Sequence, residues 1–166
     1  IAGHWAEQSI KELVASRAIS GYPDATFKPD SNITRAEFAT ILVKAYNLTA
    51  PSGKVFSDTR EHWAKSAIGT AYAHNIVSGH SDSEFRPDDN ITREQMAIMI
   101  VQAEKLATQE GELTFADAKK ISYWSRDAVL TANKAGIISG YPDNTFRPQG
   151  HATRAEAVTV VLKGIR

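Results

Sequence analysis

The sequence predicts an all-α protein in which three helix–loop–helix repeats pack as one cooperative domain. The first indication is self-similarity, because each of three tryptophans is followed sixteen positions later by a glycine, and each glycine thirteen positions later by a threonine. The second is the helical spacing of apolar residues on both sides of a turn-rich loop. The tryptophans are Trp5, Trp63 and Trp124, the glycines are Gly21, Gly79 and Gly140, and the threonines are Thr34, Thr92 and Thr153.

Insertions fall between the repeats, which sets their predicted boundaries at 1–49, 54–107 and 113–166. Linkers are expected near 48–54, where Ala-Pro-Ser-Gly breaks the periodicity, and near 106–113. The second and third repeats open with a Phe-x-Asp motif, at Phe56 and Phe115, whereas the matching position of the first repeat would precede Ile1. We therefore expect the sequence to be a fragment of a longer protein. A unit of about 55 residues buries too little surface alone, so the three units should pack on one another.

The first helix of each repeat is predicted from apolar residues three and four positions apart. It is expected to stop at the glycine of the following loop, which reads "SGYPDATFKPD" at 20–30 and "SGYPDNTFRPQ" at 139–149. Proline and aspartate in this loop favour a tight turn, and the glycines are expected to let the backbone turn. One phenylalanine in each loop, Phe27, Phe85 or Phe146, is expected to anchor it to the core. The apolar helix positions are Ala6, Ile10, Leu13 and Val14 in the first repeat and Trp63, Ala67, Ile68 and Ala71 in the second.

The second helix of each repeat begins with a capping box. A threonine is followed three residues later by Glu or Gln, ahead of an apolar helical pattern, so that both side chains satisfy backbone N–H groups at the helix start. Folding therefore accounts for these residues without a catalytic role. The three pairs are Thr34 with Glu37, Thr92 with Gln95, and Thr153 with Glu156.

An arginine follows each capping threonine, and the capping box does not need it. Arg35, Arg93 and Arg154 stand at the first helical position, where a cation opposes the positive end of the helix dipole. A mildly unfavourable residue used three times suggests a functional role. The alternative is a surface arginine paired with a nearby carboxylate.

Composition excludes several classes of function. Lys plus Arg and Asp plus Glu are both 19, so no global field attracts nucleic acid. No apolar run is long enough to span a membrane, and no cysteine is present for disulfides or thiolate metal sites. The histidines form no His-x-x-x-His pair, and "DSEFRPDDN" at 82–90 lacks the central glycine of a calcium loop. A glycoside hydrolase needs two carboxylates across a cleft, but the obvious acids, Glu37 and Glu156, are already used as caps. No nucleophile motif is seen either, so we expect neither an enzyme nor a cofactor.

The motifs "HWA", "SGYPDxTFxP" and "ITRAE" at these spacings resemble the S-layer homology domain family over nearly the whole chain. The resemblance implies a pseudo-threefold, three-pronged spindle with a central helix bundle and grooves between neighbouring prongs. It also implies a secreted protein of the bacterial cell surface that attaches non-covalently to a secondary cell wall polysaccharide carrying ketal-linked pyruvate on N-acetylmannosamine. Neighbouring S-layer molecules could contact regions outside this sequence.

The resemblance implies that Arg35, Arg93 and Arg154 meet the pyruvate carboxylate in these grooves. A guanidinium can make a two-pronged contact with a carboxylate, and free N–H groups at the same helix start would favour the anion. Other candidate ligand contacts have a structural alternative, namely packing for the tryptophans and tyrosines and backbone turning for the glycines. These candidates are Trp5, Trp63, Trp124, Gly21, Tyr22, Gly79, Gly140 and Tyr141.

The second repeat departs from this pattern. It has His80 and Ser81 in place of Tyr-Pro, and Glu94 next to Arg93, where it could act as an internal partner. We therefore expect the groove that uses Arg93 to bind more weakly than the groove that uses Arg35. A different function also remains open, in which the repeats serve lateral self-assembly of a surface array without binding polysaccharide.

Overall fold

The computed structural model describes residues 1–50 and 53–166, and this part of the chain is helical. It contains no β-strand, only three isolated β-bridges. The prediction of an all-α fold is confirmed. The described elements are α1 (Glu7–Ala15), α2 (Arg35–Ala45), α3 (Lys65–Ala73), α4 (Arg93–Glu104), the short 3-10 helix η1 (Ala118–Lys120), α5 (Arg126–Lys134) and α6 (Arg154–Ile165).

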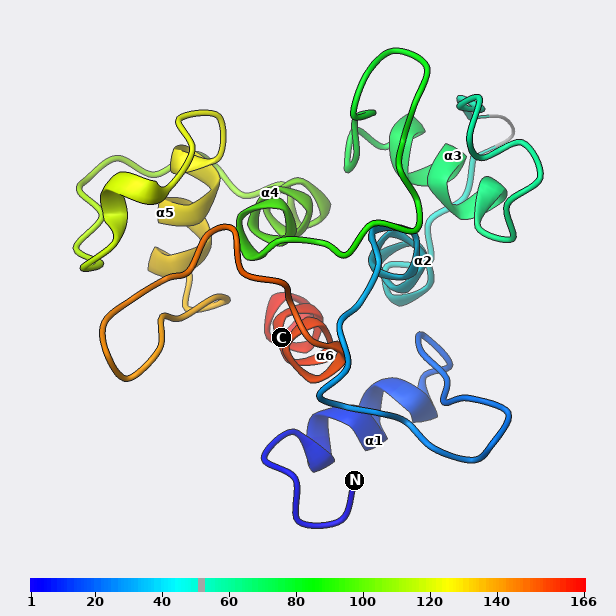
Figure 1. The fold of residues 1–166 in the computed structure, drawn as a ribbon, viewed down its shortest axis with the longest axis horizontal. Helices are drawn as coiled ribbons and strands as arrows, with labels where there is room; N and C mark the ends of the chain where they lie inside the picture. Colours follow the sequence, from blue (N-terminus) through cyan, green and yellow to red (C-terminus); the bar gives the residue numbers. More distant parts are fainter. Residues whose placement is uncertain (51–52) are drawn as a thin grey trace.

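The helices form a three-pronged spindle with pseudo-threefold symmetry. The second helices of the three repeats, α2, α4 and α6, lie together at the centre, and α1, α3 and α5 lie outside them (Figure 1). Each outer helix packs on the central helix of the preceding repeat, α3 on α2 and α5 on α4, while α1 closes the ring on α6. Helix–loop–helix units therefore complete one another, as the small size of each unit requires.

A ring of backbone hydrogen bonds joins the segments that lead into the central helices. The Ile33 N–H donates to the Ala152 carbonyl at 3.1 Å, the Ile91 N–H to the Ile33 carbonyl at 2.9 Å, and the Ala152 N–H to the Ile91 carbonyl at 3.0 Å. All three residues are fully buried. Because a buried backbone group needs a partner, this cycle fixes the three repeats in register around the axis.

All three central helices begin with a complete capping box. In α2 the Thr34 hydroxyl accepts a hydrogen bond from the Glu37 N–H at 3.1 Å, and the Glu37 carboxylate accepts one from the Thr34 N–H. The same reciprocal pair joins Thr92 to Gln95 and Thr153 to Glu156. Each cap fixes the direction in which the helix leaves the central ring.

The outer helices end earlier than the sequence indicated, so the prediction that they stop at Gly21, Gly79 and Gly140 is wrong. They end at Ala15, Ala73 and Lys134. Two residues beyond each end the backbone enters the left-handed region, which breaks the helical hydrogen bonding. The left-handed residues are Arg17, Asn75 and Gly136, with φ values of 62°, 58° and 72°.

The three loop glycines are needed because another part of the loop backbone lies close to them, and not because the backbone turns there in a left-handed conformation. None of Gly21, Gly79 and Gly140 has a positive φ. A Cβ at Gly21 would instead lie 2.7 Å from the Thr26 carbonyl oxygen, and a Cβ at Gly140 would lie 2.8 Å from the Thr145 carbonyl oxygen. Any side chain at these positions would collide with the opposite side of the loop.

The loop phenylalanines reach the core, as predicted. Phe85 and Phe146 are fully buried and Phe27 is 8% exposed. The predicted repeat boundaries remain predictions, and Pro51 and Ser52 of the predicted first linker lie outside the described residues.

Candidate inter-repeat groove

The three arginines that start the central helices each reach across to the next repeat. Their Nε atoms donate to the carbonyl oxygen of the loop phenylalanine there, from Arg35 to Phe85 at 3.0 Å and from Arg93 to Phe146 at 2.7 Å. Arg154 closes the cycle by donating to Phe27 at 2.9 Å. Each guanidinium also lies over the ring of that phenylalanine. The contact of each arginine with the loop phenylalanine of another repeat is thus the same at all three positions.

The N–H groups at these helix starts are already bonded, so the expectation that they are free for an anion is wrong. In α2 the Arg35 N–H donates to the Asp89 carbonyl and the Ala36 N–H to the Pro87 carbonyl, both at 2.9 Å. The Glu37 N–H is held by the cap. Loops of the neighbouring repeats bind the starts of α4 and α6 in the same way. Any anion recognition must therefore come from side chains.

Every guanidinium nitrogen of Arg154 already donates to a partner within the protein. Its Nη1 donates to Glu37 Oε2 at 2.8 Å and its Nη2 to the Ser20 carbonyl at 2.8 Å, in addition to the Nε contact. The residue is 4% exposed, and Tyr22 lies 4.8 Å from the guanidinium carbon, measured to the ring centroid. This arginine fastens the third repeat to the first.

Arg93 is nearly as enclosed. Its Nη2 donates to the Ser139 carbonyl at 2.8 Å, and its Nη1 lies 3.7 Å from Glu156 Oε1. The Tyr141 hydroxyl donates to the same carboxylate oxygen at 2.9 Å. Burial raises the pKa of Tyr141, the Arg93 charge opposes this rise, and the hydrogen bond to Glu156 adds to it. Arg93 is 5% exposed.

Arg35 differs from both. Within residues 1–50 and 53–166, only its Nε has a hydrogen-bond partner, and neither terminal nitrogen lies in an ion pair. Burial lowers the pKa of the Arg35 guanidinium, and the carboxylates of Asp89 and Asp58 oppose this lowering. The side chain is partly buried and retains two unused donor groups.

Two contacts account for the difference. Arg93 and Arg154 each donate from Nη2 to a loop serine carbonyl, of Ser139 and Ser20, and within the described residues no such bond joins Arg35 to the equivalent Ser78.

The other contact is with a capping residue. Each arginine faces the capping acid or amide of the next repeat, so Arg154 pairs with Glu37 and Arg93 with Glu156. The equivalent residue for Arg35 is Gln95, an uncharged amide. Because the Thr92 N–H donates to Gln95 Oε1 at 3.1 Å, the amide nitrogen of Gln95 points away from the cap. The sequence analysis treated Gln95 only as a cap, although its difference from Glu37 and Glu156 is visible in the sequence.

A groove of about 570 Å³ opens beside Arg35. Gln95, His80 and Arg86 supply polar groups to it, and Trp124 of the third repeat, 52% exposed, contributes an aromatic surface. Asp89 also lines this groove. The groove therefore combines cationic and amide donors with an aromatic ring, contributed by all three repeats. Its lining consists of Arg35, Ile76, Val77, Ser78, Gly79, His80, Arg86, Asp89, Asn90, Thr92, Gln95, Ile98, Met99 and Trp124.

Most of the other predicted site residues lie apart from this groove. Trp5 and Trp63 are 65% and 66% exposed, so burial in the core does not account for them. Tyr22 and Tyr141 lie against the enclosed guanidinium groups of Arg154 and Arg93. Of the predicted glycines, Gly79 lines the groove.

Two premises of the predicted groove ranking are wrong. The loop with His80 lies against Arg35, and Arg93 faces Tyr141, because each arginine meets the loop of the following repeat. Glu94 does not pair with Arg93. Its carboxylate instead accepts hydrogen bonds from the Ser122 and Ser125 hydroxyls, both at 2.8 Å. These bonds hold the start of α5.

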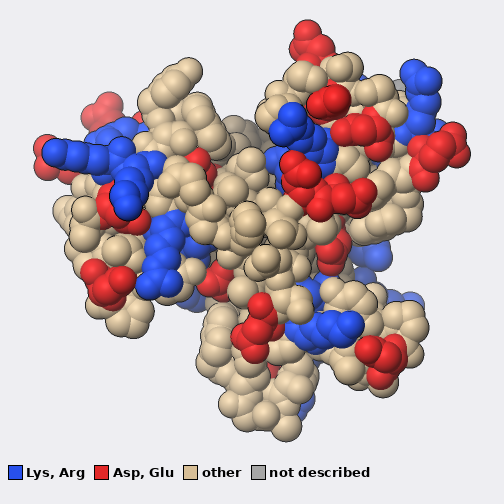
Figure 2. Space-filling model, in the orientation of Figure 1, with Lys and Arg blue, Asp and Glu red and all other residues tan. Residues whose placement is uncertain are grey.

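Basic and acidic side chains are interspersed over the three prongs on the face shown in Figure 2. Over the described ranges, no three His, Cys, Asp or Glu residues cluster as potential metal ligands. None of the helices described has the length and apolar character needed to cross a bilayer.

Comparison with known proteins gives matches along the whole chain. The family described as S-layer homology domain matches residues 1–39, 55–97 and 114–158. An amylopullulanase from Thermoanaerobacterium thermosulfurigenes is 37% identical over 97% of the chain, and S-layer protein EA1 from Bacillus anthracis is 32% identical over 96%. A cellulosome-anchoring protein from Acetivibrio thermocellus is 35% identical over 74%. The matched regions make up 9%, 19% and 29% of the lengths of these relatives.

Proposed function

The chain belongs to the S-layer homology domain family, and from this premise we propose that it anchors a secreted protein to the cell wall by binding an anionic polysaccharide. Its relatives include proteins of the S-layer and the cell surface, which places the chain on a secreted, cell-surface protein. The ligand we propose is a secondary cell wall polysaccharide that carries ketal-linked pyruvate on an N-acetylmannosamine-type sugar.

The observation that carries the proposal is that neither terminal nitrogen of Arg35 has a partner among the described residues, in a groove that Trp124 also lines. Two terminal nitrogens of one guanidinium match the two oxygens of a carboxylate, and such contacts are charge-assisted. The ketal pyruvate supplies that carboxylate. The exposed indole offers an apolar face for a sugar ring and one N–H donor.

The partly buried position of Arg35 favours recognition of a fixed anion. A guanidinium that has lost part of its hydration gains more from a carboxylate than a fully hydrated one does, because solvent screens the contact less. Gln95 can donate its amide N–H to the same ligand, since its oxygen is held by the Thr92 cap. In this proposal Arg93 and Arg154 support the fold, and the Arg35 groove is the main binding site.

Asp89 opposes the proposed ligand, which makes it useful for a test. Its carboxylate lies on the groove wall, where the equivalent positions of the other repeats hold Ser31 and Gly150. Replacing it removes negative charge near the bound anion. We therefore expect Asp89→Ser to strengthen binding and Arg35→Ala to abolish it.

Calorimetric titration of the pyruvylated polysaccharide, and of the same polysaccharide stripped of pyruvate, tests the proposal. Binding to the pyruvylated form alone, lost in Arg35→Ala and at least as strong in Asp89→Ser, supports it. Equal binding to both forms would show that the carboxylate is not recognised. Absence of binding to either form, together with self-association of the chain, would favour lateral self-assembly instead.

A further inference from the structure

The proposed binding site does not use the histidines of the two HWA motifs, although each is largely buried and bonded through both ring nitrogens. The side chains of His62 and His4 are 11% and 15% exposed. The Ala64 N–H donates to His62 Nδ1 at 3.1 Å, so Nε2 carries the proton of the neutral ring and donates to Asp88 Oδ1 at 2.8 Å. His62 therefore joins the start of α3 to the loop that follows this helix.

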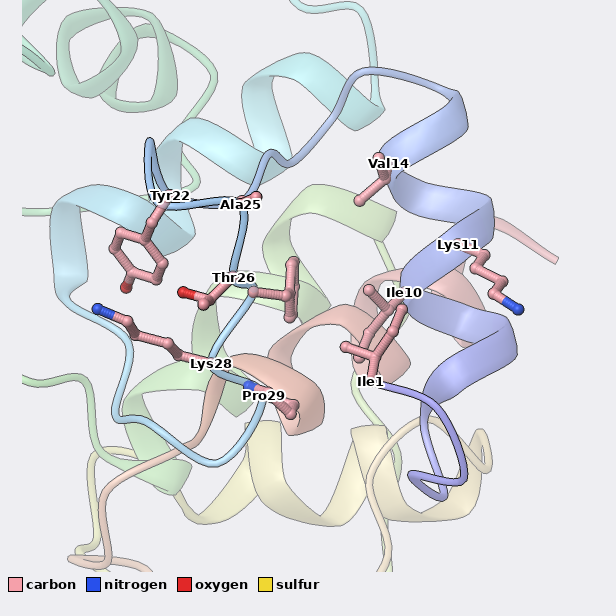
Figure 3. A pocket seen from close by; sticks show the side chains of 11 residues that line it. Ile1, Ile10, Lys11, Val14, Tyr22, Ala25, Thr26, Lys28 and Pro29 are labelled. Atoms are coloured by element: carbon pink, nitrogen blue, oxygen red, sulfur yellow. The ribbon is translucent and has the colours of Figure 1, made fainter.

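The same contact is present in the first repeat. The Ala6 N–H donates to His4 Nδ1 at 3.1 Å, and His4 Nε2 donates to Asp30 Oδ1 at 3.1 Å. Figure 3 shows the two elements that this contact joins, α1 and its loop, facing each other. We call this arrangement, in which one imidazole bonds both a helix start and a loop aspartate, a histidine clamp.

The third repeat replaces the clamp with other contacts. Tyr123 and Gln149 stand where the other repeats have histidine and aspartate, and Tyr123 is 91% exposed. Gln149 Nε2 donates to the Lys120 carbonyl at 2.8 Å and to Glu94 Oε1 at 3.4 Å. Glu94 stands at a position that α2 and α6 fill with alanine. Three substitutions together thus keep this loop joined to the segment ahead of α5, which indicates that the joint is needed in every repeat.

The loop held by His62 supports the base of Arg35. Asp88 lies between the two residues whose carbonyls accept the first two N–H groups of α2, at 2.9 Å each. A third carbonyl of this loop, that of Phe85, accepts the Arg35 Nε. Asp58 holds the other end of the loop by accepting two of its N–H groups at 3.0 Å and 2.8 Å. The backbone and the side chain of Arg35 are therefore both fixed to the loop that His62 holds.

The same loop contributes to the lining of the Arg35 groove. Arg86, Asp89 and Asn90, on either side of Asp88 in the sequence, line the groove. Neither His62 nor Asp88 does so. Any influence of His62 on a bound ligand must therefore act through the position of the loop.

We propose that His62 is a positioning residue for the Arg35 groove and acts through Asp88. It fixes the loop on which both the guanidinium and part of the groove lining depend. The inference rests on the proposed function, because it gives His62 a part in holding Arg35 for a carboxylate. Two parallel contacts between one guanidinium and one carboxylate require a narrow range of positions, so a looser loop lowers the affinity.

The first repeat supplies the matched control. His4 holds the loop whose Pro29 and Ser31 carbonyls accept the first two N–H groups of α6. Arg154 begins this helix, and each of its guanidinium nitrogens already donates within the protein. His4→Ala should therefore loosen the start of α6 and leave the Arg35 groove unchanged.

Amide hydrogen exchange measures the clamp without any ligand. His62→Ala should speed exchange at the first two amides of α2 at least about fivefold and leave the first two amides of α6 unchanged. His4→Ala should do the reverse. Asp88→Asn keeps an oxygen that accepts the histidine N–H, so exchange in this variant should stay within about twofold of the unmodified chain.

Calorimetric titration with a pyruvylated N-acetylmannosamine monosaccharide measures the consequence for binding. His62→Ala and Asp88→Ala should each weaken binding about fivefold, since the groove is less preorganised, and the double variant should be no weaker than either. Asp88→Asn and His4→Ala should bind as the unmodified chain does. A merely structural histidine would lower Tm in both His62→Ala and His4→Ala without separating their affinities.

Two results would overturn the proposal. One is unchanged exchange at the start of α2 in His62→Ala, and the other is equal affinity of His62→Ala and His4→Ala in a chain whose binding depends on Arg35. If Arg35→Ala bound the monosaccharide as well as the unmodified chain does, or if neither bound it, the proposed function would fail and the link from His62 to binding with it. The exchange rates would still show whether His62 holds the start of α2.

Discussion

The Arg154 and Arg35 sites occupy equivalent positions in the pseudo-threefold ring but have different partners. Arg154 donates from all three nitrogens, to Glu37 and to two loop carbonyls, whereas Arg35 donates from Nε alone. The residue facing Arg35 is Gln95, where the residue facing Arg154 is a glutamate. An arginine that joins two repeats thus differs from one that is available to a ligand in two contacts, a carboxylate replaced by an amide and a bond from Nη2 to a loop serine carbonyl that Arg35 lacks among the described residues.

The largest effect should follow from removing the enclosed guanidinium. Arg154→Ala leaves Glu37 without its cation and two carbonyls without a donor, and breaking a buried ion pair of this kind costs about 3 kcal/mol or more. Urea unfolding should show this loss in the free energy of unfolding. A loss below about 1 kcal/mol would mean that Arg154 is no more structural than a surface arginine.

Glu37→Gln should have a smaller effect, because it reproduces at Arg154 the arrangement found at Arg35. A glutamine still completes the capping box, as Gln95 does, so only the charge-assisted contact is lost. We expect a loss of about 1–2 kcal/mol in the free energy of unfolding. Thr34→Ala is the matched control for the cap itself, with an expected loss of about 1 kcal/mol. If Glu37→Gln were no less stable than the unmodified chain, the ion pair would contribute nothing.

Arg35→Ala should have the smallest effect on stability. One Nε–carbonyl hydrogen bond and contact with the Phe85 ring are lost, while no carboxylate loses its partner. We expect a loss of less than about 1 kcal/mol, measured by the same urea unfolding. A loss equal to that of Arg154→Ala would remove the distinction between the two sites.

Local features of the fold could be predicted from the sequence. The three capping boxes depend on residues three positions apart, and the structure forms all of them. The helical periodicity likewise identified the helix pairs. The end of α1 was missed because its left-handed residue is Arg17, a type that gives no sequence signal for this conformation. Asn75 and Gly136, after α3 and α5, are types that adopt it readily, and the sequence analysis passed over them in favour of the later loop glycines.

The partners of the arginines could not be predicted from local spacing. Arg154 contacts Glu37 across 117 positions of the chain, because the ring closes between the first and third repeats. The same closure brings the loop with His80 to Arg35 and directs Glu94 to Ser122 and Ser125. Once the pairing of each arginine with the following repeat is known, the substitution of Gln95 for glutamate indicates which groove differs.

Gln95→Glu tests the central claim most directly. It restores a carboxylate opposite Arg35 and keeps the capping box, so Arg35 should pair internally as Arg154 does. Calorimetric titration with a pyruvylated N-acetylmannosamine monosaccharide should then show affinity at least about tenfold weaker than for the unmodified chain, a loss of about 1.4 kcal/mol, with the free energy of unfolding unchanged or higher. Unchanged affinity in a folded Gln95→Glu chain would contradict the claim that the amide at this position leaves Arg35 available to the ligand.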